Sequence, residues 1–480
     1  MTVAVSEPVT LGPLERLEAL CDPGSLHVIR SSVASRRMGD RARPGDGVVG
    51  AAGRVNGRPV FGYAQDTSYA GGSLGEQHAE TIVRVLRLAH QARVPVVGFV
   101  ASAGARMQEG VGALAGYGRI FGEHVRLSGL VPQISVIAGT SAGGGSYSPA
   151  LTDFVVMTRE ASMFLTGPAV VREVLGEDVD AAALGGPRVH ERNGVAHNVV
   201  DDDLAAARHV RDLLSYLPQH AGADPEPHPP APPEPGDPGA VVPASSRTTY
   251  DVRDVVARVV DGGSLLEVQP RWARNVVCAF ARLEGRAVGV VANQPRFLGG
   301  VMDADCAQKA ARFVRTCNTF NLPLLVFVDT PGFMPGTQQE QAGVIRHGAK
   351  LLHAFAEGEV PKLTVVLRKA FGGAYITMNS RALGAHLSFA WPGAEVGVMG
   401  AEQAVGVIHR RALAAAADPG AERARLAREY AREHLHARVA AGDGHVDEII
   451  EPAATRARLA WGLSTLAGVP RGSQRPNIPL

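Results

Sequence analysis

Two glycine-rich turns are the parts of this sequence whose residue types could do chemistry. Gly143-Gly144 lies within residues 141–145, and Gly372-Gly373 lies within residues 371–375. Each turn follows an apolar run typical of a buried strand and precedes an expected helix. The first N–H groups of a helix have no partner within it, and glycine lets a ligand approach them. Each turn could therefore act as an oxyanion hole; the alternative is close packing of strand against helix.

The two turns belong to an internal duplication. Several short motifs recur 228 residues later (285 − 57 = 228), and the turn itself recurs at 229 (372 − 143 = 229). The pairs are Gly57-Arg58-Pro59-Val60 with Gly285-Arg286-Ala287-Val288, Gly71-Gly72 with Gly299-Gly300, Pro95 with Pro323, Gly104 with Gly332, and Gly143-Gly144 with Gly372-Gly373. Because the offset between paired motifs changes by only one residue, the sequence indicates two repeats of one unit.

The elements around the first turn define the fold class. The pattern predicts strand 59–64, helix 76–93, strand 94–101, helix 113–128 and strand 133–138. Strands that alternate with helices are typical of an α/β protein with parallel strands. Residues 219–249 are rich in proline and predict an extended linker. We therefore expect an N-terminal domain at 1–218 and a C-terminal domain at 250–480.

Composition excludes several classes of function. The formal net charge is +1, which argues against nucleic-acid or membrane-surface binding by bulk charge. No apolar run is long enough to span a bilayer, and the N-terminus lacks the features of a signal peptide. The four cysteines have no CxxC spacing, and no residue cluster has metal-ligand spacing. We expect a cytoplasmic protein without a metal.

Two other motifs offer alternatives. Residues 139–143 fit the G-x-S-x-G pattern of a nucleophile elbow around Ser141, but the second turn carries no serine. Asp329 and Gly332 fit the DxxG of GTPases, but the chain has no GxxxxGK[ST] phosphate loop. No pair of carboxylates stands out as acid and base. Two oxyanion holes without a strong base from the protein suit a reaction that forms an enolate next to a thioester. The second hole would then bind a second carbonyl oxygen.

Further motifs resemble the carboxyltransferase (β) subunits of biotin-dependent acyl-CoA carboxylases, from about residue 11 to the end. They are residues 71–76 (GGSLGE), 104–110 (GARMQEG), 147–154 (YSPALTDF), 291–295 (VANQP), 309–315 (KAARFVR), 331–336 (PGFMPG), 346–352 (RHGAKLL) and 477–480 (NIPL). The resemblance implies two fused crotonase-type domains, one that holds acyl-CoA and one that holds carboxybiotin.

The resemblance also implies roles for individual residues. Gly143 and Gly144 would bind the thioester oxygen, and Gly373 and Ala374 would bind the ureido oxygen of biotin. The expected substrate-binding residues are Gly71, Gly72, Ala103, Gly104, Gly332, Phe333, Gly372 and Ile376. Ile376 occupies a position associated in the family with the choice of acyl group; its alternative role is core packing. In the family biotin itself removes the α-proton, which would explain why the chain offers no base.

The chain lacks the parts that would load biotin. None of its four lysines has the Met-Lys-Met setting of a biotinylation site, and no ATP-binding motif is present. We therefore expect a separate biotin carboxylase/biotin carrier subunit. The resemblance further implies a homo-oligomer, a hexamer with sites shared between chains. Two alternatives remain open: a biotin-dependent decarboxylase subunit that runs the transfer backwards, and a non-catalytic scaffold of the same fold.

Overall fold

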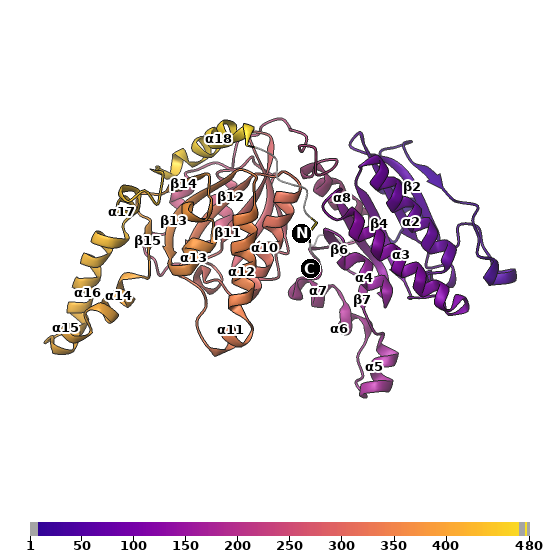
Figure 1. Cartoon of the computed structure of the whole chain (residues 1–480), viewed down its shortest axis with the longest axis horizontal. Helices are drawn as coiled ribbons and strands as arrows, with labels where there is room; N and C mark the ends of the chain where they lie inside the picture. Colours follow the sequence, from indigo (N-terminus) through magenta and orange to yellow (C-terminus); the bar gives the residue numbers. More distant parts are fainter. Residues whose placement is uncertain (1–7, 470–475, 478–480) are drawn as a thin grey trace, which may run out of the picture.

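Two eight-stranded sheets form the framework of the chain. The computed structural model describes residues 8–469 and 476–477. The first repeat and the second repeat lie side by side along the long axis of the molecule (Figure 1). Strands follow the order β1-β2-β3-β4-β5-β6-β8 in the first sheet, with β7 beside β5. The second sheet repeats this order as β9-β10-β11-β12-β13-β14-β16, with β15 beside β13. The predicted duplication is therefore confirmed at the level of topology.

The first repeat contains eight strands and eight α-helices among the described residues. Its strands are β1 (His27–Ile29), β2 (Val48–Val55), β3 (Arg58–Gln65), β4 (Val96–Ser102), β5 (Gln133–Ala142), β6 (Phe154–Thr158), β7 (Ser162–Phe164) and β8 (Asn198–Val200). Its helices are α1 (Pro13–Leu20), α2 (Glu76–Ala92), α3 (Val111–Leu127), α4 (Gly144–Ala150), α5 (Pro168–Leu175), α6 (Ala181–Gly185), α7 (Pro187–Asn193) and α8 (Asp203–Tyr216). The strands and helices predicted around the first turn all exist within a few residues of their expected bounds.

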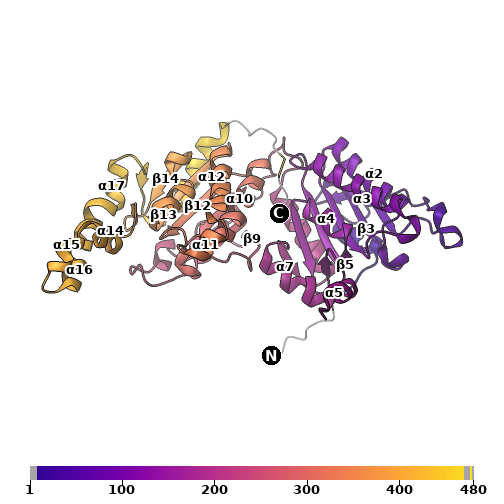
Figure 2. The same ribbon diagram turned by 60° about the horizontal axis from the view of Figure 1, so that its bottom comes forward.

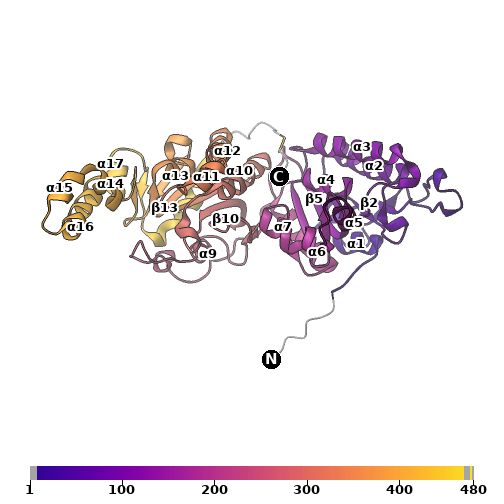
Figure 3. The same cartoon turned by 90° about the horizontal axis from the view of Figure 1, so that it is seen from below.

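The second repeat follows the same plan and adds a helical arm. Its strands are β9 (Leu266–Val268), β10 (Val276–Leu283), β11 (Arg286–Asn293), β12 (Leu324–Thr330), β13 (Lys362–Phe371), β14 (Leu387–Ala390), β15 (Glu395–Gly397) and β16 (Glu448–Ile449). Its helices are α9 (Val252–Ala257), α10 (Ala304–Thr319), α11 (Thr337–Gln341), α12 (Val344–Glu357), α13 (Gly372–Thr377), α14 (Ala401–Ile408), α15 (Arg410–Ala415), α16 (Pro419–Tyr430), α17 (Ala437–Gly442) and α18 (Thr455–Thr465). In Figure 3 helices α14, α15 and α16 form the far end of this half.

Each sheet is a hairpin extended by parallel strands. β2 and β3 pair antiparallel, whereas β3, β4, β5 and β6 pair in parallel. The buried, β-branched strands explain the continuous apolar runs in the sequence, because a parallel sheet is covered on both faces. Helices α2 and α3 pack together in the first repeat, and α10 and α12 pack together in the second (Figure 2). The carboxyl ends of the parallel strands thus carry both glycine turns.

A repeated aspartate fixes the hairpin of each repeat. The Asp22 carboxylate accepts hydrogen bonds from the N–H groups of residues 56 and 57 at 3.0 and 2.7 Å. The Asp261 carboxylate accepts hydrogen bonds from residues 284 and 285 at 3.1 and 2.8 Å. Both hairpin turns contain a residue pair with positive φ, which leaves the two N–H groups pointing to one side. The same hairpin turn, held by an aspartate carboxylate, therefore recurs in both repeats.

The seam between the repeats is apolar and is closed by the end of the chain. Phe280 of the second repeat packs on Phe154 of the first, with ring centroids 5.8 Å apart, within a core cluster that draws on both repeats. Asn477 bridges the seam: its carbonyl accepts from Ser128 Oγ at 2.8 Å, and its side chain donates to Thr316 Oγ1 at 3.0 Å. The last three residues of the terminal motif lie outside the described residues.

The proline-rich segment 219–249 lies against the second repeat. It contains one 3₁₀ turn, at Pro238–Val241. The N–H of His228 donates to the carbonyl of Gly285 at 2.9 Å, and the carbonyl of Pro232 accepts from Gly262 at 3.0 Å. We keep the division into 1–218, 219–249 and 250–480 as a proposal, supported by one sheet on each side of this segment. In the part of the chain that the structure describes, no helix is both long and apolar enough to cross a bilayer.

Candidate active site

The first glycine turn joins β5 to α4. Gly143 has φ of +58°, a conformation that favours glycine, and its N–H donates to the Phe164 carbonyl in β7 at 3.1 Å. Gly144 is the first residue of α4, and no side chain caps this helix. The N–H of Gly145 hydrogen-bonds the Tyr117 hydroxyl. That Gly143 and Gly144 bind the thioester oxygen stays a prediction. In this structure the Gly143 N–H is bonded to β7, whereas Gly144 lies in the first turn of α4, where N–H groups lack partners within the helix.

Tyr117 supports the first turn from α3. A Cβ on Gly144 would lie 2.7 Å from Cγ of the Tyr117 ring, closer than real side chains approach. The Tyr117 hydroxyl also lies 3.3 Å from Ser102 Oγ at the end of β4. Burial raises the pKa of Tyr117 above its ordinary value, so the hydroxyl stays neutral. The sequence requires glycine at 144 because the turn rests directly on an aromatic ring.

The second glycine turn joins β13 to α13 in the same geometry. Gly372 has φ of +60°, matching Gly143, and Phe371 precedes it as an N-cap without a hydrogen-bonding side chain. Gly373 and Ala374 lie in the first turn of α13, where N–H groups lack partners within the helix. A Cβ on Gly373 would meet only Phe333 Cδ2, at 3.9 Å. The approach to these donors is therefore open.

The other expected substrate residues of the first repeat gather around its turn. The N–H of Ala103 donates to the Gly71 carbonyl at 3.1 Å, and the Gly104 carbonyl accepts from Leu74 at 2.8 Å. A Cβ on Gly104 would lie 3.6 Å from the carbonyl of Ala142, directly before the turn. A side chain on Gly72 would overlap the backbone of β4. These residues form one ledge at the carboxyl ends of β3, β4 and β5.

The second repeat builds the matching ledge. The Gly332 carbonyl accepts from the N–H of Met302 at 3.0 Å, as Gly104 does from Leu74. Phe333 pairs with Met302 in an isolated bridge and lies below Gly373. Ile376 projects from α13 with 46% of its surface exposed, which argues against the core-packing alternative. The substrate-binding residues expected in the second repeat thus come together with Gly373 and Ala374 at the ends of β12 and β13.

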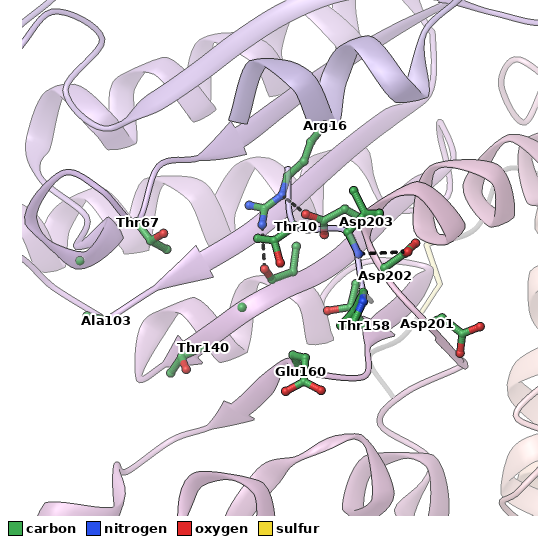
Figure 4. Close-up of a pocket in the computed structure, with 15 residues that line it drawn as sticks. Thr10, Arg16, Thr67, Ala103, Thr140, Thr158, Glu160, Asp201, Asp202 and Asp203 are labelled. Carbon is green, nitrogen blue, oxygen red and sulfur yellow. Dashed lines mark hydrogen bonds and ion pairs between the residues drawn. The ribbon is translucent and has the colours of Figure 1, made fainter. Parts of the chain in front are cut away.

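A cavity of about 490 Å³ opens beside the first ledge (Figure 4). Gly71 and Ala103 line it, as do Thr140 of β5 and Thr67. Arg16 of α1 borders the cavity and donates to Asp203 and to the carbonyl of Ala138. The remaining lining residues are Pro8, Val9, Thr10, Ala138, Gly139, Thr158, Glu160, Asp201, Asp202 and Asp203. Along β5 the cavity is lined by Ala138, Gly139 and Thr140, the residues that precede the turn at 141–145.

A buried ion triad holds the first ledge in place. Arg106 Nη1 contacts Asp46 Oδ1 at 2.6 Å and Glu109 Oε1 at 2.8 Å, and all three side chains are fully buried. Arg106 also donates to the carbonyl of Ser73 at 3.0 Å, and Glu109 accepts from the N–H of Glu76 at 2.7 Å. The triad therefore ties residues 73–76 to the loop after β4. Sequence reasoning missed this role, although Arg106 and Glu109 lie in a recognised motif.

A second buried ion cluster lies at the end of β12. Asp329 Oδ2 accepts from Tyr250 at 2.9 Å and from Arg368 Nε at 3.0 Å, and Lys369 Nζ lies 3.8 Å from Oδ1. Burial raises the pKa of Asp329, and the Arg368 guanidinium opposes that shift. Asp329 and Arg368 are charged residues in two otherwise apolar strands, and this pattern was the sequence signal that could have revealed the cluster. Because Asp329 is engaged in this way, the structure offers no GTPase-like role for it.

The remaining alternative motif is not built for catalysis. Ser141 lies inside β5 and is fully buried, and its hydroxyl has no hydrogen-bond partner. A serine nucleophile requires a histidine within hydrogen-bond reach, and none of the described hydrogen bonds joins Ser141 to one. The residues that the structure describes also contain no group of three or more side chains that could hold a metal.

Comparisons with known proteins agree with this geometry. The carboxyl transferase domain family matches residues 10–476. The chain is 47% identical to the methylmalonyl-CoA carboxyltransferase 12S subunit of Propionibacterium freudenreichii subsp. shermanii, covering 94% of this chain and 88% of that one. It is 46% identical to the propionyl-CoA carboxylase carboxyltransferase subunit of Haloferax mediterranei, covering 97% and 93% of the two chains.

A solved structure extends the match to three dimensions. The transcarboxylase 12S crystal structure, described as a hexamer with methylmalonyl-CoA and methylmalonic acid bound, superposes with a TM-score of 0.94 at 46% identity. The match covers 98% of this chain and 92% of that chain. Fold and site thus define a tandem crotonase-like protein of the acyl-CoA carboxyltransferase class. The chain belongs to the carboxyl transferase family, and it is an enzyme that acts between biotin carried on a separate subunit and an acyl-CoA.

Proposed function

We propose that this chain moves the carboxyl group of carboxybiotin to the α carbon of a short acyl-CoA. Acetyl-CoA would give malonyl-CoA, and propionyl-CoA would give methylmalonyl-CoA. The observation that carries the proposal is the uncapped glycine turn at equivalent places in the two repeats, at Gly144 and at Gly373-Ala374. One donor aimed at a developing oxyanion typically contributes about 2.7–4 kcal/mol to the transition state.

Each turn would hold one oxygen whose negative charge grows during the reaction. The acyl-CoA would lie in the cavity beside β5, with its thioester oxygen at the N–H of Gly144. This hydrogen bond would stabilise the enolate formed when the α-proton leaves. Gly373 and Ala374 would hold the ureido oxygen of biotin. Biotin, when bound, supplies both the carboxyl group and the basic atom, which is consistent with the lack of a protein base at either turn.

A homo-oligomer would complete these sites, and we propose a hexamer with each site shared between two chains. Large apolar side chains stand exposed close to both turns. Met107 is 89% exposed beside the first ledge, and Val398 is 74% exposed with its carbonyl 3.1 Å from where a Cβ on Gly372 would lie. A neighbouring chain of the hexamer would cover these exposed side chains. The hexamer of the related transcarboxylase 12S supports the same assembly.

The test of the proposed function is its dependence on a biotin-carrying partner. Lys309 is buried and donates to the carbonyls of Gln269, Trp272 and Val276 at 2.9–3.0 Å, so a biotin ligase cannot reach it. Lys362 is buried too, and Lys350 lies within helix α12 rather than in a hairpin. The purified chain should give no avidin signal and no ATP-dependent fixation of labelled bicarbonate into acyl-CoA.

Activity should appear when a biotin carboxylase and biotin carrier subunit is added, and the partner alone provides the control. An avidin-positive band from this polypeptide, or ATP-dependent turnover by it alone, would contradict the proposal. The same assay addresses the two alternatives. A decarboxylase subunit would release CO₂ from malonyl- or methylmalonyl-CoA faster than it fixes it, and a scaffold would do neither with any partner. The relatives named as carboxylases favour the forward direction.

The side chain at 376 should affect the choice between acyl groups. Ile376 projects from α13, two residues beyond Ala374 of the second turn. A carboxylate at this position would change the polarity where acyl group and biotin meet. Ile376→Asp should therefore change the ratio of kcat/KM for acetyl-CoA and propionyl-CoA by about 10–200-fold, the range for one methylene in an apolar pocket.

The matched control is Val28→Asp, a β-branched residue of similar exposure (43%) on the edge strand β1. It should leave the ratio unchanged. Equal ratios for the wild type and Ile376→Asp would assign Ile376 no role in acyl choice.

A further inference from the structure

The two repeats differ at one place where their topology is the same. The first repeat has an open cavity beside β5, whereas the corresponding place beside β13 is occupied by the chain itself. We propose that Arg368 and Asp329 prevent the second repeat from binding CoA. They hold the end of the linker across it, so that each chain binds one CoA and not two. The inference rests on the proposed function, in which the cavity of the first repeat binds the CoA.

The duplication identifies the counterparts. Arg368 in β13 corresponds to Gly139 in β5 (368 − 139 = 229), the same offset that relates the two positive-φ glycines at 372 and 143. Asp329 in β12 corresponds to Ala101 in β4 (329 − 101 = 228). Helix α9 and strand β9 begin 239 residues after α1 and β1, so residues 247–249 correspond to residues 8–10. At both pairs of equivalent positions, the first repeat therefore has a small residue where the second repeat has a charged one.

In the first repeat Gly139 and residues 8–10 line the cavity, whereas Ala101 is buried within β4. Gly139 adds no side chain, and Thr140 projects beside Ala103 and Thr67 toward the space drawn in Figure 4. Residues 8–10 form part of the rim. With glycine at 139, none of the hydrogen bonds among the described residues joins β5 to residues 8–10.

In the second repeat a buried arginine fills the corresponding space. The Arg368 Nη1 atom donates to the carbonyls of Ser245 and Thr248 at 2.9 Å each and to that of Pro243 at 3.4 Å. Lys369 Nζ donates to the carbonyl of Ser246 at 3.4 Å. Residues 243–248 therefore run over the end of β13 as a strap held by main-chain carbonyls.

Asp329 makes this arrangement rigid. Its carboxylate accepts from Arg368 and from the hydroxyl of Tyr250, the first residue after the linker, while the Arg368 guanidinium lies 5.1 Å from the centre of the Tyr250 ring. The carboxylate is fully buried, and the arginine is 7% exposed. If Arg368 moved away, the buried carboxylate of Asp329 would lose its guanidinium partner, which costs free energy. The strap is therefore a fixed part of the second repeat, held by Arg368 just before the glycine turn at Gly372-Gly373.

The experiment counts CoA sites per chain by isothermal titration with free CoA. The wild type should bind one CoA per chain. The double variant Asp329→Ala/Arg368→Gly restores the residues of the first repeat and should bind a second, weaker CoA. Trypsin cleavage after Arg247, an exposed strap residue paired with Glu402, should become at least tenfold faster in this variant. Arg368→Lys alone, which keeps a cation beside Asp329, should bind one CoA.

A reverse variant keeps the test decisive even if the double variant does not fold. Gly139→Arg places the arginine in the first cavity, and it should lower CoA affinity at least tenfold while size-exclusion chromatography shows an unchanged oligomer. Two sites per wild-type chain, one site in a folded double variant with a released strap, or unchanged affinity in Gly139→Arg would each overturn the inference. A wild-type chain that binds no CoA would instead contradict the proposed function, and the inference with it.

Discussion

Replacement of Gly373 by valine should reduce carboxylation by about 10²–10³-fold in kcat, the cost of losing one oxyanion donor. The side chain would stand in front of the N–H groups of the second turn. The fold should tolerate it, because a Cβ on Gly373 meets only Phe333 Cδ2 at 3.9 Å and the residue has no positive φ. The measurement is kcat with acyl-CoA and the biotin-carrying partner at saturating concentrations.

The matched control is Gly442→Val at the end of α17. A Cβ there also has no neighbour within 4 Å, and this glycine lies far along the chain from the turn. The control should keep nearly full activity, and both variants should keep the wild-type circular dichroism. Near-normal carboxylation by a folded Gly373→Val protein would show that this turn does not hold the reacting oxygen.

Replacement of Arg106 by methionine should destabilise the first repeat by about 3–5 kcal/mol, the cost of breaking a buried ion pair from one side. The change leaves the carboxylates of Asp46 and Glu109 buried without their common partner. Methionine keeps much of the side-chain volume, so the loss reports charge and hydrogen bonds rather than a cavity. Urea titration of the purified protein measures the free energy of unfolding.

Arg87→Met is the control for this prediction. Arg87 also pairs with a glutamate, Glu123, at 2.8 Å, but its side chain is 49% exposed. An exposed pair typically contributes about 0–1 kcal/mol. If the two variants lose equal stability, the buried triad does not hold the ledge as described.

The spacing of glycines predicted the fold well because the backbone at the repeated positions requires glycine. Gly143 and Gly372 both need positive φ, and side chains on Gly72 or Gly300 would overlap the neighbouring strand. Such constraints act over a few residues and leave a mark in the sequence. The order of strands follows from them, because a parallel strand needs a helix between itself and the next.

The details of the site could not be predicted because they depend on distant partners. The N–H of Gly143 is taken by Phe164, which reaches β5 only through the pairing of β7. Arg106 meets Asp46, which lies 60 residues earlier, and Arg368 meets linker carbonyls more than 100 residues earlier. A carbonyl carries no sequence signal, so the extended linker was predicted but its attachment to the second site was not.

Asn477 has a consequence for the order in which the protein is made. It joins Ser128 of the first repeat to Thr316 of the second, and it follows Thr316 by 161 residues. A ribosome therefore completes both sheets before it adds residue 477. The two repeats must meet first through Phe154 and Phe280, and the bridge can close the seam only afterwards.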